Sequence, residues 1–295
     1  IYSIDVLIFE EDSLRCTFYQ HFDLASPSIG TGSTTEELNT IQSQFRYGVN
    51  YDTFVVANYT GTELQRLGKN IDRGTLTSRV ESGLDPDAVQ SSFLMDGVYT
   101  MVLNDGVQKN KTIPVKLKRA ASKIRVQIVY DQTKYTVPAG TTVEKMLMNY
   151  TPSGFVVASG GLLTFNQESM QVFTPFENGA GGNGKAIMYS YENNWVADQQ
   201  AATYLILNIP VEDAQGVHTD NYYRVPVNYR YSNDGSHDVY KLQRNYLYDI
   251  TVHVNALGSD NPGTAEPISS SYTIMDWTTK QVEVSVEGAE FIYVK

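Results

Sequence analysis

The sequence is poor in the residues that build disulfides and metal sites. Its 295 residues include one cysteine, Cys16, which excludes an internal disulfide bond and a zinc site made of several thiolates. We assign Cys16 the role of a small buried strand residue. No two of the four histidines lie two or four positions apart. The pattern therefore predicts no metal site and no catalytic triad built on His21, His218, His237 or His253.

Positive charge is scarce, and long apolar runs are lacking. The chain has 22 Lys and Arg against 33 Asp and Glu, a net charge of −11. Nucleic-acid binders normally carry a basic excess or stripe, so this charge argues against nucleic acid as a partner. No apolar run approaches the ~20 residues that span a bilayer. Because a strand pattern starts directly at Ile1, we expect a processed or trimmed chain without a signal peptide.

A glycine-rich segment comes nearest to a cofactor motif. Residues 179–185, GAGGNGK, fit the first seven positions of a phosphate-binding G-x-x-x-x-G-K loop, but Ala186 replaces the hydroxyl residue that holds Mg²⁺. Residues 187–191 indicate a strand, where a phosphate loop requires a helix. We therefore predict a hairpin loop, no cofactor and no enzymatic activity. The paired carboxylates of a glycosidase, which meet only in space, stay open as an alternative.

Short apolar and alternating segments dominate the sequence. Side chains alternate across a strand, so an apolar residue at every second position indicates a strand with one buried face. Strands are predicted at residues 4–9, 14–22, 51–58, 98–103, 112–130, 155–158, 162–165, 170–174, 186–191, 203–209, 222–230 and 246–254. Many short strands between turn signals predict a β-sandwich, or two sandwiches in series.

Few helices are expected. Thr-x-x-Glu spacings, which are typical of helix N-termini, predict helices over residues 35–45 and 141–148. A single helical turn is predicted from Thr62 to Gly68, where the glycine ends it. Residues 69–92 indicate a loop with short helical pieces. The predicted fold class is therefore mainly all-β, with a few short helices.

A change in the alternation marks the predicted domain boundary. Val115 and Leu117 continue one apolar face, and Ile124 and Val126 continue another, with the change of phase near Ala121. A change of phase reverses which face of a strand is buried. We therefore predict an N-terminal sandwich over residues 1–121 and a C-terminal sandwich over residues 122–295.

The end of the chain is apolar instead of polar. Val282, Val284 and Val286 alternate strictly, and residues 291–294, FIYV, are apolar on both faces. A segment that is apolar on both faces must pack against other parts of the protein. One hypothesis is that it forms the last hairpin of the C-terminal domain, with a turn at Glu287 and Gly288.

Six blocks of sequence, in order, resemble one protein family. They are residues 4–9 (IDVLIF), 54–58 (FVVAN), 93–97 (FLMDG), 115–124 (VKLKRAASKI), 242–248 (LQRNYLY) and 272–277 (YTIMDW). Together they resemble the fimbrillins, the major-fimbria type V pilin subunits of Bacteroidales, over nearly the whole chain. The resemblance implies two transthyretin-like, Greek-key β-sandwich domains.

The resemblance also implies a location and partners. Fimbrillins are exported as lipoproteins, trimmed at the N-terminus by an outer-membrane protease, and assembled into cell-surface fimbriae by donating a β-strand to a neighbour. The expected partners are other fimbrial subunits, and the only membrane contact is a lipid anchor that is removed. No lipidation cysteine or cleavage arginine precedes Ile1. A tip or anchor component that binds a host glycan or protein is the alternative function.

The hypothesis of strand donation assigns candidate residues. The donor strand comprises Val282, Val284, Val286, Phe291 and Tyr293, because alternate side chains of an added strand fill pockets while its main chain gives affinity. The candidate acceptor groove lies beside Ile4, Val6 and Ile8, where removal of an N-terminal strand would leave a bare edge.

Two further residues receive structural roles. Trp277 is predicted to be a core anchor more than a ligand platform. Arg244 is predicted to bond neighbouring carbonyls or a carboxylate.

Overall fold

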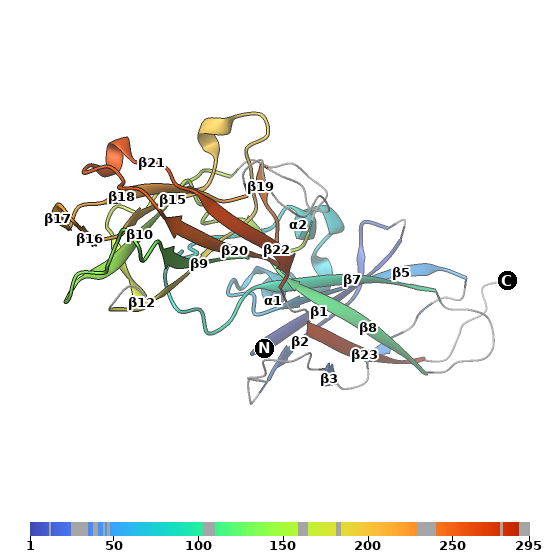
Figure 1. The fold of residues 1–295 in the computed structure, drawn as a ribbon. Coiled ribbons are helices and arrows are strands. Elements are labelled where there is room, and N and C mark those ends of the chain that lie inside the picture. Colours follow the sequence, from blue (N-terminus) through green and yellow to red (C-terminus); the bar gives the residue numbers. More distant parts are fainter. Residues whose placement is uncertain are drawn as a thin grey trace.

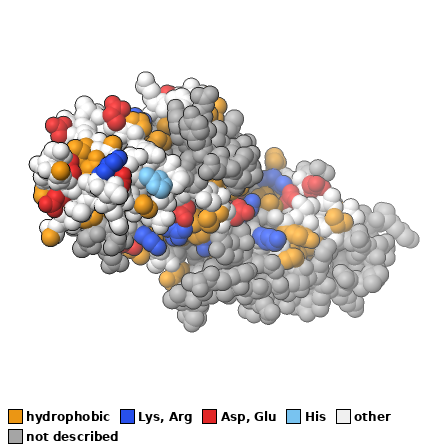
Figure 2. All heavy atoms as spheres, in the orientation of Figure 1, with side chains coloured by type: hydrophobic (Ala, Val, Ile, Leu, Met, Phe, Trp, Pro, Cys, Tyr) orange, Lys and Arg blue, Asp and Glu red, His pale blue; other side chains and the backbone are white. Residues whose placement is uncertain are grey.

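The computed structural model describes residues 1–11, 13–24, 35–37, 41–43, 45, 48–102, 110–158, 165–180, 184–228, 240–277 and 280–288. Most of the described strands belong to two curled β-sheets, one at each end of an elongated molecule (Figure 1). The mainly all-β fold class is therefore confirmed. Small groups of hydrophobic side chains lie between acidic and basic ones on one face of the molecule (Figure 2).

The first sheet has eight strands and contains both the beginning of the chain and its last described strand. Its order is β2 (Cys16–Asp23), β1 (Ser3–Glu10), β5 (Asn50–Ala57), β7 (Met95–Val102), β8 (Asn110–Arg119), β23 (Lys280–Gly288) and β3 (Thr35–Glu37), while β4 (Ile41–Ser43) also pairs with β23. The sheet curls around a core that includes Ile4, Val6 and Ile8 of β1 and Ile113, Val115 and Leu117 of β8.

The central strand β1 is buried on both faces, as its sequence predicted. Ile4, Val6 and Ile8 face the sandwich core, while Leu7 and Phe9 face a second cluster. That second cluster is covered by α1 (Glu63–Leu67), η1 (Gly68–Asn70) and α2 (Arg73–Thr77), which supply Leu64, Ile71 and Leu76. The predicted helical turn over residues 62–68 is confirmed, and Gly68 ends it with φ of 52°.

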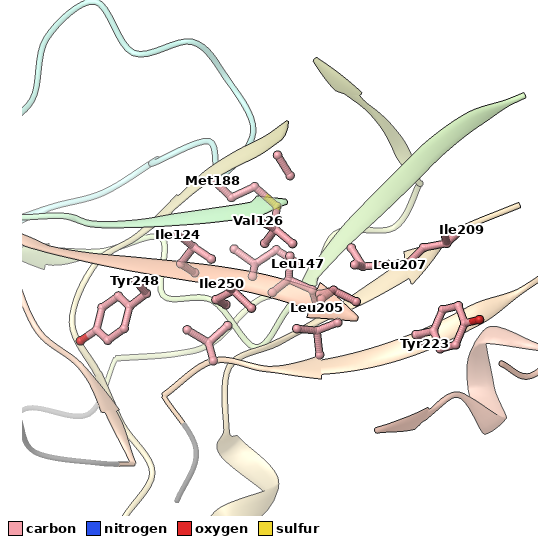
Figure 3. Close-up of a cluster of buried hydrophobic side chains, with 14 of the residues drawn as sticks. Ile124, Val126, Leu147, Met188, Leu205, Leu207, Ile209, Tyr223, Tyr248 and Ile250 are labelled. Carbon is pink, nitrogen blue, oxygen red and sulfur yellow. The ribbon is translucent and has the colours of Figure 1, made fainter. Parts of the chain in front are cut away.

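The second sheet has nine strands. Its order is β21 (Glu266–Pro267), β18 (Tyr222–Pro226), β15 (Tyr204–Asn208), β10 (Thr142–Met148), β12 (Thr174–Ala180), β13 (Lys185–Ser190), β9 (Ser122–Tyr130), β20 (Tyr246–Val254) and β22 (Ser270–Asp276). Alternate residues of β9 and β20 meet those of β10, β15 and β18 in a hydrophobic core (Figure 3). Strands β9 and β20 run parallel, with Ile124 opposite Tyr248 and Val126 opposite Ile250.

Shorter elements lie at the edges and between the two sheets. They are β6 (Val80–Glu81), β11 (Gly154–Phe155), β14 (Asn193–Asn194), β16 (Val211–Asp213), β17 (Gly216–His218), β19 (Lys241–Leu242), η2 (Gln199–Ala201) and η3 (Pro262–Thr264). Strand β6 pairs with β11, which lies on the other side of the predicted boundary. The two halves therefore share a backbone ladder.

Two predicted helices are wrong. Residues 142–148 form β10, which is paired on one side by β12 and on the other by β15. Val143 and Leu147 suit a helix as well as a strand, but Lys145 between them is also buried, which fits a period of two. The Thr141 hydroxyl donates to Pro138 O and caps no helix. In residues 35–45, β3 and β4 pair in parallel with the sequence-remote β23, so a tertiary partner overrides the local signal.

The change of phase near Ala121 separates two strands. Strand β8 ends at Arg119 in the first sheet, and β9 begins at Ser122 in the second. Ala120 and Ala121 are buried between them. Residues 162–164 of the strand predicted at 162–165, and residues 181–183 of the predicted hairpin loop, lie outside the described residues, and Phe165 is in no strand. Cys16 is buried, as expected, and burial raises the pKa of its thiol to about 11.

A polar network surrounds the buried Asp5 of β1. Asp5 Oδ1 accepts hydrogen bonds from Tyr19 Oη at 2.7 Å and from the His21 ring at 2.8 Å. Asp23 also contacts His21, at 3.1 Å. Burial lowers the pKa of His21, but the hydrogen bonds and charges of Asp5 and Asp23 raise it more, so the net shift is upward from 6.5.

The network predicts a pH dependence of stability. Because the folded pKa of His21 lies above the unfolded one, its contribution is fully present below the unfolded pKa of about 6.5 and is lost as the pH rises through the folded pKa. We expect the urea midpoint to fall between about pH 6 and pH 8 more steeply in the native chain than in His21→Gln. Parallel midpoint profiles for the two proteins would contradict this.

A core substitution tests the second sandwich. Leu205 of β15 is fully buried in its core, so Leu205→Ala should lower the free energy of unfolding by about 2–5 kcal/mol. Val129→Ala, at a residue of β9 with 48% of its surface exposed, should change it by less than about 0.5 kcal/mol. Urea denaturation measures both. Equal effects would contradict the assignment of the core.

Candidate functional site: the slot of the C-terminal strand

The last described strand, β23, lies in the first sandwich between β8 and the pair β3 and β4 (Figure 1). It runs antiparallel to β8 from Lys280 opposite Leu117 to Glu287 opposite Asn110. On its other edge it runs parallel to β3 and β4. Strand β23 therefore has backbone partners on both edges. Its Val282 is fully buried in the first core.

Strand β8 forms one wall of this slot. Its side chains alternate, with Ile113, Val115 and Leu117 fully buried and Pro114 and Lys116 exposed. Among the described residues, β7 pairs with β8 at Met95 and Asp96, whereas β23 pairs with β8 from Lys280 to Glu287. Gly97 follows that short pairing, and a Cβ there would collide with the Lys116 carbonyl.

The structure places the predicted donor residues in this slot as far as it describes them. Val282 lies opposite Val115, Val284 opposite Ile113 and Val286 opposite Lys111. Phe291 and Tyr293 lie outside the described residues. The hypothesis that this segment forms a hairpin of the second domain is wrong, because β23 continues through Glu287 and Gly288 within the first sheet. Residues 280–288, predicted as part of the C-terminal domain, thus belong to the N-terminal sandwich.

The predicted acceptor residues lie in the same core as Val282. Ile4, Val6 and Ile8 are fully buried there. The expected bare edge beside them is wrong, because β1 pairs with β2 on one side and with β5 on the other. These side chains form the opposite wall of the core, and the strand that completes the sheet lies beside β8.

The base of β23 is fixed where the chain passes between the sheets. Strand β22 ends at Asp276 in the second sheet, and β23 begins four residues later in the first. Between them, Trp277 packs edge-on against Phe93, with ring centroids 4.8 Å apart, and stacks on Tyr189 at 6.0 Å. The guanidinium of Arg119 lies 4.4 Å from the centre of the indole. Trp277 is thus an anchor between domains.

Asn245 ties this anchor to the domain boundary. It adopts a left-handed conformation with φ of 62°, which asparagine tolerates better than most residues. Its side-chain amide donates to Trp277 O at 2.7 Å, and Trp277 N donates to Asn245 O at 2.7 Å. Its Oδ1 accepts from Arg119 N, and its own N–H donates to Ala121 O. Asn245 therefore joins the end of β8, the boundary and the base of β23.

A buried ion pair lies beside Asn245. Arg244 Nη1 donates to Asp96 Oδ1 at 3.0 Å, and Nη2 donates to Phe155 O at 2.9 Å. Asp96 Oδ2 accepts from Ala158 N at 2.7 Å. Burial raises the pKa of Asp96, although the charge of Arg244 opposes this shift. The predicted role of Arg244 is confirmed, since it bonds both a carbonyl and a carboxylate.

The part of the chain that the structure describes contains no group of three or more His, Cys, Asp or Glu side chains placed to hold a metal ion. Within the same residues, no helix is long and apolar enough to cross a bilayer.

Comparison with curated proteins finds sequence similarity to a fimbrial protein. No family model matches the chain. The major fimbrium tip subunit FimD of Porphyromonas gingivalis is 23% identical over 207 residues, which cover 70% of this chain and 29% of FimD. The chain therefore matches less than a third of the length of that relative.

Solved structures share the fold over nearly the whole chain. A candidate cell adhesion protein from Parabacteroides distasonis superposes with a TM-score of 0.61 at 14% identity, covering 94% of this chain and 88% of that one. A fimbrilin, FimA, from Porphyromonas gingivalis gives 0.54 at 13% identity, covering 99% and 92%.

This chain has a fimbrillin-type fold. The resemblance found in the sequence is thereby confirmed. The tip fimbrial protein Mfa3 from Porphyromonas gingivalis also shares the fold, with a TM-score of 0.53 at 16% identity over 94% of both chains.

The sequence analysis missed two residues of the junction between the sandwiches. Asp96 and Asn245 lie within the blocks that carry the resemblance, but neither was given a role. An acidic residue inside the otherwise apolar run of residues 93–98 was an available signal, because a buried carboxylate needs a partner. The left-handed conformation of Asn245 had no comparable signal.

Removing one partner of the buried pair tests the junction. Asp96→Ala removes the hydrogen-bonded carboxylate of the buried Arg244 and leaves it only the longer contact with Glu192 Oε2, 3.8 Å from Nε, so the free energy of unfolding should fall by up to about 3–5 kcal/mol. Asp249→Ala removes the partner of Arg125, whose side chain is 36% exposed, and should cost about 0–1 kcal/mol. Urea denaturation compares them. A cost for Asp96→Ala no larger than that for Asp249→Ala would contradict the assignment.

Proposed function

We propose that this chain is a non-enzymatic subunit of a cell-surface fimbria that polymerises by donating β23 to a neighbouring subunit. The observation that carries the proposal is the position of β23. It is the last described strand of the chain, yet it completes the first sandwich. A short connection after Trp277 joins it to the second sandwich.

A strand in this position is suited to exchange. If β23 leaves, it uncovers one edge of β8, one edge each of β3 and β4, and the core around Val282. An uncovered edge recruits another strand. The β23 of a second copy offers the same backbone bonds and the same valine, so exchange costs little in contacts. The exchanged contact is head-to-tail and does not close, and repetition builds a filament.

The junction makes the donated strand project from a fixed base. Trp277 and Asn245 hold the chain up to the start of the connection through two hydrogen bonds of 2.7 Å. We propose that β23 pivots after Trp277 while β22 stays paired with β20 over seven residue pairs. The two sandwiches then need no rearrangement of their own.

The relatives support a fimbrial role and an alternative position. Both FimD and Mfa3 are named as tip proteins, which favours a tip component that binds a host glycan or protein as the second candidate. In either role we propose export to the outer membrane through a lipid anchor that is later removed. Sequencing the N-terminus of the protein recovered from cells tests this, and an unprocessed, unlipidated precursor in the mature fraction would overturn it.

A disulfide trap tests strand donation. Gln281 of β23 lies opposite the exposed Lys116 of β8, and directly opposed Cβ atoms lie ~5 Å apart, near the span of a disulfide. We substitute Lys116→Cys and Gln281→Cys in a Cys16→Ser background. Fimbriae assembled by this variant in cells under reducing conditions and then oxidised should give a ladder of covalent multimers on a non-reducing gel.

The order of oxidation supplies the control. Oxidation before assembly should close the bond within one chain and leave monomers, and reductant should restore assembly. Each single-cysteine variant should give no ladder beyond dimers. Assembled fimbriae that yield only intrachain bonds on oxidation would show that β23 remains paired with β8 of its own chain. Another segment would then join the subunits.

A further inference from the structure

A cavity on the second sandwich lies away from β23 and from the junction. Its volume is about 550 Å³, within the range of small-molecule sites. The walls come from η2 and the start of β15, from the end of β18, and from the segment between β21 and β22. Ala202, Pro226, Val227 and Ile268 give it an apolar lining.

Arg224 lines this cavity and has no acidic partner among the described residues. Arg224 and Tyr204 lie on the face of β15 and β18 opposite the core residues Leu205 and Val225, and Arg224 lies 3.9 Å from the centre of the Tyr204 ring. Among the described residues, none forms an ion pair with Arg224 or accepts a hydrogen bond from its side chain. The cation–π contact places the guanidinium over the face of the Tyr204 ring.

Uncharged polar side chains lie on the same walls. Gln199, Ser269 and Ser270 line the cavity, and their side chains bond no described residue. Ser269 and Gln199 are exposed, and Ser270 is half-buried. A fixed guanidinium fork matches a carboxylate with two parallel bonds. Hydroxyl and amide groups around an apolar floor match the hydroxyls and the apolar ring face of a sugar.

We propose that this cavity binds an acidic monosaccharide unit, a hexuronic or sialic acid, with its carboxylate on Arg224. The ring lies over the apolar wall formed by Pro226 and Ile268, and its hydroxyls meet Ser269, Ser270 and Gln199. The net charge of the chain also bears on the choice of an anionic sugar over a neutral one. In a protein of net charge −11, a cation left without a carboxylate partner supplies the local charge that an anionic ligand requires.

Titration calorimetry of the full chain with glucuronic acid, N-acetylneuraminic acid and neutral glucose tests the proposal. At least one acidic sugar should bind, and glucose should bind much more weakly. Arg224→Gln should weaken acidic-sugar binding about 10- to 100-fold, because it removes charged hydrogen bonds to the carboxylate. Arg224→Lys keeps the charge but not the fork and should restore only part of the affinity.

Arg66→Gln is the matched control. Arg66 is an exposed residue of α1 in the first sandwich, so the variant loses the same charge elsewhere and should bind as the native chain does. A circular dichroism spectrum and urea midpoint like those of the native chain show that the Arg224 variants are folded.

Three results would overturn the proposal. They are no binding of either acidic sugar, equal binding of glucose, or full binding by folded Arg224→Gln. An N-acetylated dipeptide that binds more tightly than both sugars would also overturn it and assign the cavity to a peptide carboxylate. The disulfide trap on β23 is independent of every one of these outcomes.

Discussion

The pairing of β23 with β8 is the contact on which the rest of the first domain depends. Through it, the last described strand closes a sheet that begins with the first residues of the chain. The pairing extends over eight residue pairs and buries Val282 in the same core as Ile4 and Leu117. Without it, β8 has little pairing left beyond Met95 and Asp96 of β7. The first domain is thus made of two distant pieces of sequence.

The junction between the sandwiches combines polar specificity with aromatic packing. Arg244 donates to Asp96 and to Phe155 O, and Asp96 also accepts from Ala158 N. Buried ion pairs contribute modestly to stability but penalise wrong arrangements, because a misplaced charge is left without a partner. Trp277 adds apolar contact with Phe93 and Tyr189. The ion pair and the aromatic contacts together join the two domains at this junction.

Sequence patterns predicted the parts of the fold that depend on local burial. The alternation in β1, β9 and β20 predicted strands, and the change of phase near Ala121 predicted where β8 gives way to β9. Residues 35–45 and 141–148 failed because their Thr-x-x-Glu spacings suit a helix, while the actual partners of β3, β4 and β10 lie far away in sequence. The valines of residues 282–286 showed that a strand exists there. They did not show which domain it joins, since both sandwiches offer an apolar core.

The order in which the strands are made has a further consequence. Strand β8 ends at Arg119, but its main partner β23 begins only at Lys280. At a synthesis rate of about 5–20 residues per second, the ribosome completes β8 many seconds before it makes β23, the strand that closes the first sheet. Between the synthesis of β8 and that of β23, a nascent chain therefore carries an open sheet, with the second sandwich free to fold first.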